Sequence, residues 1–76
     1  MTIEKLTAEY NAAVAAFDAA HVDLLHNVRP SHTNEDFVRL GLEKARAGRA
    51  LNDAEFRAWQ DQRDAAEDAA KAAGVL

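Results

Sequence analysis

The sequence contains no cysteine, a single proline and only three glycines among its 76 residues. Without thiols the chain can form neither a disulfide framework nor a thiolate metal site, although folds of this size often rely on one of them. A chain this short forms at most one domain, so we expect residues 1–76 to be a single domain. Its stability must then come from the packing of its own elements or from a partner.

Long apolar runs and an excess of positive charge are missing as well. The longest apolar stretch spans only a few residues, whereas a membrane helix needs roughly 20. Met1 is not followed by the basic and apolar segments of a secretory signal, so we expect a cytoplasmic protein with no membrane association. The net charge of −4 disfavours nucleic-acid binding, which depends on clustered Lys and Arg.

Alanine is what the sequence has in abundance, at eighteen of its 76 positions. Alanine is the strongest helix former because it loses no side-chain entropy on ordering, and the composition therefore predicts an all-α fold. Large apolar residues recur in steps of three and four from Thr2 to Val28, which predicts a long first helix at about 2–28. Thr2 can cap its start, and Pro30 ends it by pushing Arg29 out of the α region.

A short second helix is predicted at about 34–47. Thr33 and Asp36 have the spacing of a capping box, with Asp in the usual place of Glu. Phe37 and Leu40 give this helix an apolar stripe. Gly48 is placed to end it as a left-handed residue.

A third helix is predicted at about 53–73, because Asn52 and Glu55 form a second capping signal. Phe56 and Trp59 are its only large apolar residues, and the rest of its inner face is alanine. The sequence thus predicts a three-helix bundle or a helical hairpin with a long first helix. We expect helices 1 and 3 to pair antiparallel through their alanines, with helix 2 across the open end. Trp59 would then be buried near Phe17 or Leu24.

No group of side chains in the sequence predicts catalysis, a metal or a cofactor. His21 and His26 are five residues apart, which points their rings to different helix faces, and the paired Glu-x-x-His motif of di-iron bundles is missing. The carboxylates between residues 61 and 68 lie on an alanine-rich helix and should face water. Catalytic carboxylates need burial or a cleft. We therefore expect a protein that is not an enzyme.

A DNA-binding helix-turn-helix is an alternative interpretation of helices 2 and 3. Its basic cluster would consist of Arg39, Lys44, Arg46 and Arg49. The recognition helix would begin with Asp53 and Glu55, however, whose charge has the wrong sign for contact with phosphates. We therefore expect these arginines to pair with neighbouring acidic residues or to contact a protein.

The segment Gly41–Phe56, with the sequence GLEKARAGRALNDAEF, resembles the toxin-binding C-terminal region of some small bacterial antitoxins. In those proteins a helix ends in Ala-Gly-Arg and the next begins with an acidic cap. Before this segment the present chain has its long predicted helix in place of their DNA-binding portion. The resemblance implies a small protein that wraps around a protein partner.

Two functional hypotheses follow. The first is a noncatalytic, acidic helical protein of a bacterium or phage that binds another macromolecule as an inhibitor, antitoxin or adaptor. The second is a structural or assembly protein that acts as a helical homo-oligomer. Aromatic residues on helix 3 form either the core of the monomer or an exposed anchor for a partner. The candidate partner-binding residues are Phe56, Trp59, Arg46, Arg49 and Arg39.

Overall fold

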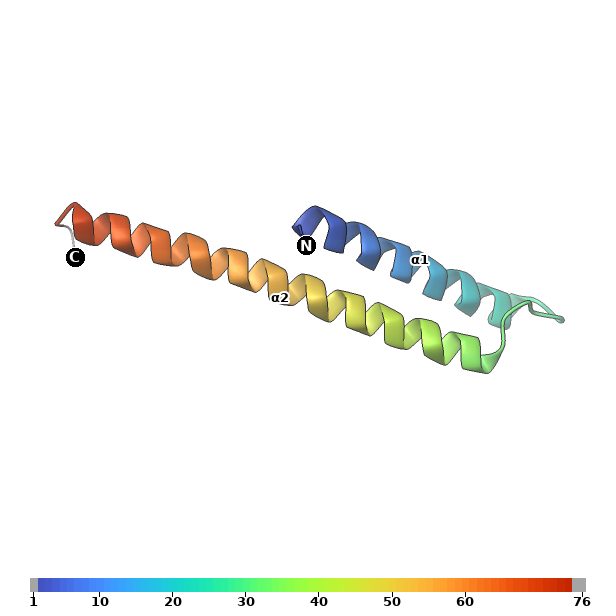
Figure 1. Cartoon of the computed structure of the whole chain (residues 1–76). Helices are drawn as coiled ribbons and strands as arrows, with labels where there is room; N and C mark the ends of the chain where they lie inside the picture. Colours follow the sequence, from blue (N-terminus) through green and yellow to red (C-terminus); the bar gives the residue numbers. More distant parts are fainter. Residues whose placement is uncertain (1, 75–76) are drawn as a thin grey trace.

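The computed structural model, which describes residues 2–74, is an all-α helical hairpin (Figure 1). Helix α1 spans Ile3–His26 and helix α2 spans Asn34–Ala72, and the two run antiparallel. Within residues 2–74 there is no strand, and neither helix is long and apolar enough to cross a membrane. The molecule is a rod of 69 × 19 × 16 Å, because α2 has 39 residues and α1 only 24.

Both helices begin at the predicted caps. The Thr2 hydroxyl accepts a hydrogen bond from the Lys5 backbone N–H at 3.2 Å. At the start of α2 the Thr33 hydroxyl accepts from the Asp36 N–H at 3.1 Å, and the Asp36 carboxylate accepts from the Thr33 N–H at 2.9 Å. This reciprocal pair is the capping box that the sequence predicted.

The prediction of three helices is wrong, because the expected second and third helices are one continuous helix. Helix α2 passes through Gly48 and Asn52 without a break, and the only positive φ among the described residues is the 77° of Gly74. One Gly or Asn inside a helix costs at most about 1 kcal/mol. A break would leave up to four N–H and four C=O groups without helical partners. The local stop and start signals are therefore overridden.

Gly41 and Gly48 allow the two helices to approach closely. A Cβ atom at Gly41 would lie 3.3 Å from the Phe17 ring, and one at Gly48 would lie 3.1 Å from the Tyr10 ring. The two aromatic residues and the two glycines are each seven residues apart, which is the repeat of a coiled coil. The glycine that looked like a helix end is a packing position.

These two contacts fix the register of the hairpin. In an antiparallel pair of helices the numbers of facing residues add to a constant sum, and Tyr10 with Gly48 gives the same sum as Phe17 with Gly41. The same sum places Ile3, at the start of α1, level with Glu55 of α2. Helix α1 therefore packs on the first half of α2, and the predicted pairing of helices 1 and 3 is wrong, as is a helix across the open end. Leu6 and Ala20 are buried in this seam. The seam positions of α1 follow steps of three and four: Ile3, Leu6, Tyr10, Ala13, Phe17, Ala20 and Leu24.

Beyond the start of α1, the last part of α2 and its C-cap residue Ala73 continue alone (Figure 1); we call residues 56–73 the extension. Trp59 lies there and is 52% exposed, so the prediction of a buried Trp59 is wrong. Trp59 is exposed because α1 is too short to reach it. Phe17 packs at Gly41, which is about 27 Å along the helix axis from Trp59 at 1.5 Å per residue.

The turn between the helices is held by Asp23, whose side chain is only 12% exposed. Its carboxylate accepts hydrogen bonds from the Asn27 side-chain amide and from the His32 backbone N–H, the latter at 2.8 Å. The ring Nδ1 of His32 lies 2.7 Å from the same carboxylate. These hydrogen bonds, that of Asn27 first, lower the pKa of Asp23 from 3.8 to about 2.

We expect Asp23→Asn to lower the melting temperature at neutral pH. A carboxyl whose pKa is lowered by folding stabilises the native state above its unfolded pKa of 3.8, and this contribution is lost as pH falls to about 2. The variant should therefore also show a weaker decline of melting temperature across that interval. Thermal melts followed by circular dichroism measure both effects. Asp18→Asn, an exposed acid on the same helix, is the control, and equal behaviour of the two variants would contradict the role of Asp23.

Candidate interaction surface

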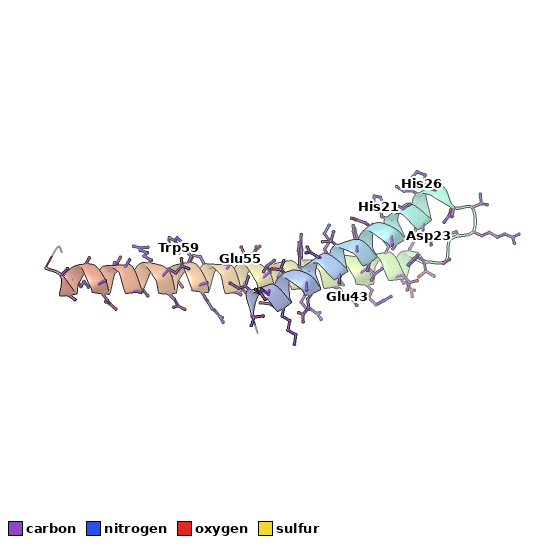
Figure 2. The ribbon with its side chains drawn as sticks, turned by 90° about the horizontal axis from the view of Figure 1, so that it is seen from above. His21, Asp23, His26, Glu43, Glu55 and Trp59 are labelled. Carbon is purple, nitrogen blue, oxygen red and sulfur yellow. The ribbon has the colours of Figure 1, made fainter. Side chains whose placement is uncertain are left out.

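Phe56 and Trp59 form an exposed aromatic pair on the extension. Their ring centroids are 5.8 Å apart with the planes 28° from parallel, and the residues are 56% and 52% exposed. Figure 2 shows Trp59 on α2 beyond the end of α1. The sequence analysis named both residues as candidates, and the structure brings them together.

Arg63 lies beside this aromatic pair and contacts Trp59. It was not among the site residues predicted from the sequence. Its guanidinium lies 5.6 Å from the centre of the Trp59 ring, within the range of a cation–π contact. Its Nε also donates to the Glu67 carboxylate at 3.3 Å. The spacing of four residues between Trp59 and Arg63 is the sequence signal that identifies the contact.

A groove lies beside the seam and is lined by residues of both helices. Tyr10 and Phe17 form one wall, and Arg49 lies on the other side. The Nζ of Lys44 is 4.7 Å from the centre of the Phe17 ring. The floor consists of small or short side chains in steps of three and four along α2: Gly41, Ala45, Gly48 and Asn52. A further step of four from Asn52 reaches Phe56, so the groove and the aromatic pair share one side of α2.

A second exposed apolar surface lies near the start of α2. Val38 and Leu42 are 60% and 62% exposed and are flanked by Arg39 and Arg46. Arg39 lies 3.4 Å from the carboxylates of both Asp36 and Glu43. Arg39 therefore pairs with acids of its own helix, which is one of the two roles that the sequence left open for the arginines.

The five candidate residues do not form one site. Arg39 and Arg46 border the Val38 and Leu42 surface, Arg49 borders the groove, and Phe56 and Trp59 lie on the extension. The histidines are also separate, because His21 packs against Phe17 and Phe37 whereas His32 contacts Asp23. Among residues 2–74 no three potential metal ligands come together.

Comparison of the chain with protein-family models, curated proteins and solved structures found no match. The most distinctive part of the exposed surface is the Phe56 and Trp59 pair, because these two large rings lie on the part of α2 that no other described segment covers.

Proposed function

We propose that this chain is a noncatalytic protein that acts by binding another protein through the extension. The observation that carries the proposal is the half-exposed, stacked pair of Phe56 and Trp59 on the part of α2 that α1 does not cover. Aromatic residues and arginine are the side chains that dominate protein interfaces. The extension has both kinds of side chain in contact, because the Arg63 guanidinium lies over the Trp59 ring.

The energetics of the extension favour a partner. In proteins most of the stability of a helix comes from tertiary packing of its apolar face, and the extension has no such packing from α1. Burial of one large apolar side chain stabilises by about 1.5–3 kcal/mol, so a protein that covers both rings would strengthen the helix as it binds. An inhibitor, an antitoxin or an adaptor would use such a surface in the same way.

The fold of the free chain should not depend on Trp59. We expect Trp59→Ala to change the free energy of unfolding by less than about 0.5 kcal/mol, as for other exposed positions. A buried tryptophan would cost about 3–5 kcal/mol. Urea denaturation followed by circular dichroism gives the value, and Leu6→Ala, at a buried seam position, is the destabilised control. A loss for Trp59→Ala as large as that for Leu6→Ala would contradict the exposure of Trp59.

Site-specific photocrosslinking tests the binding function. The photoreactive residue benzoylphenylalanine would replace Trp59 in one variant and Leu42 in the other, since both positions are exposed on α2. In cells of the native source we expect position 59 to give a discrete covalent adduct with a protein, identified by mass spectrometry, and position 42 to give none. Failure to form an adduct from position 59 would overturn the proposed function.

Structural assembly as a homo-oligomer is the second candidate function. The observation that favours it is the C-terminal half of the extension, where the exposed alanines form a flat surface on which a helix can pack closely.

A further inference from the structure

One side of the extension carries a stripe of residues with bulky side chains in its first half and small side chains in its second half. Its members follow steps of three and four, so they lie on one side of α2. We call this set the extension stripe: Phe56, Trp59, Arg63, Ala66, Ala70 and Ala73. The three bulky side chains occupy its first half and the three alanines its second half. The stripe continues the groove floor past Asn52.

We infer that the partner of the extension is a second copy of this chain, bound antiparallel along the same stripe. This inference rests on the proposed function. When Phe56 lies opposite Ala73 of the other copy, Trp59 falls opposite Ala70 and Arg63 opposite Ala66, since the sum of the two residue numbers is constant. Two-fold symmetry repeats the three pairs. Every bulky side chain then meets an alanine.

The hairpin seam already uses the same packing rule. Tyr10 packs on Gly48 and Phe17 on Gly41, so a ring on one helix is matched by a small residue on the antiparallel helix. The extension stripe carries this pattern into a segment that α1 does not reach. A parallel pair of extensions would instead place Trp59 against Trp59 and leave alanine against alanine, with crowding at one end and gaps at the other.

The hairpins leave room for this arrangement. The two extensions would overlap over residues 56–73, about 27 Å at 1.5 Å per residue. Helix α1 begins level with Glu55 and runs away from the extension, so the two hairpins lie at opposite ends of the dimer. Residues 56–73 contain three basic and four acidic residues, so two extensions meet with little net repulsion, although each chain as a whole carries −4.

Exchange of one bulky and one small residue gives the sharpest test. Sedimentation equilibrium of the full-length chain should show a dimer in the micromolar to millimolar range. Trp59→Ala should weaken it by more than about tenfold, and Ala70→Trp should weaken it through a clash of two indoles. The double variant Trp59→Ala with Ala70→Trp should recover most of the affinity, because it restores one indole and one alanine in each pair. Val22→Ala, at an exposed position of α1 away from the extension, should leave it unchanged.

Disulfide trapping tests the antiparallel register. Because the sequence has no native cysteine, only the introduced cysteines can form disulfides. Chains with Arg63→Cys mixed with chains with Ala66→Cys should form the mixed disulfide in preference to either symmetric one. Predominantly symmetric disulfides would overturn the antiparallel register. A monomer at millimolar concentration, or a dimer that Trp59→Ala leaves intact, would overturn the inference.

The photocrosslinking experiment separates this inference from the proposed function. An adduct from position 59 with a second copy supports both. An adduct only with a different protein supports the proposed function and overturns the second copy as the partner, whereas failure at position 59 overturns both.

Discussion

Replacing Phe17 by alanine is expected to cost about 3 kcal/mol of unfolding free energy, the lower end of the range for a buried phenylalanine. The Phe17 ring contacts several residues of α2 across the seam. It lies against the backbone of Gly41, with its centroid 4.8 Å from that of Phe37, and Lys44 sits above it. Truncation would remove these contacts at once and leave a gap in the middle of the hairpin.

The consequence for a chain of this size is large. Single domains are stable by only about 5–15 kcal/mol, and a short two-helix hairpin has little apolar area to spare. Urea denaturation with circular dichroism measures the loss. The matched control is Val22→Ala on the same helix, which removes an apolar side chain that is 56% exposed and should cost less than about 0.5 kcal/mol. Similar losses for the two variants would mean that the seam is not centred on Phe17.

Replacing Gly48 by leucine should destabilise the hairpin by about 2 kcal/mol. A Cβ alone would lie 3.1 Å from the Tyr10 ring, and leucine would add three more carbon atoms in the space of that ring. Either Tyr10 must leave the seam or the helices must separate. Overpacking of this kind costs about 1–3 kcal/mol, and loss of Tyr10 burial adds to it. The gain in helix propensity over glycine recovers only about 1 kcal/mol.

Ala50→Leu is the control for this substitution, because Ala50 is an exposed position two residues further along the same helix. It should leave stability nearly unchanged, whereas Gly48→Leu should lower the midpoint of urea unfolding. The two variants together separate helix propensity from packing. If Gly48→Leu proved as stable as Ala50→Leu, the close contact between Tyr10 and Gly48 would not limit the approach of the helices.

The sequence by itself determined the all-α class and the boundaries that depend on neighbouring residues. The caps at Thr2 and Thr33 form hydrogen bonds with residues three positions away, so their signals are complete within one helical turn. Pro30 bars the helix from continuing through Arg29, and α1 ends before it, at His26. The sequence also named Phe56 and Trp59 as candidate partner-binding residues, because large aromatic side chains are conspicuous on an alanine-rich helix.

Only the tertiary structure decided that Gly48 and Asn52 lie inside a helix and that Trp59 is exposed. A glycine that ends a helix and a glycine that admits a ring are the same residue in the sequence, and the Tyr10 ring that distinguishes them lies 38 positions away. The exposure of Trp59 likewise depends on the register between α1 and α2, which the Tyr10 and Phe17 contacts set. With that register α1 begins level with Glu55, so the extension and its aromatic pair have no partner within the described chain.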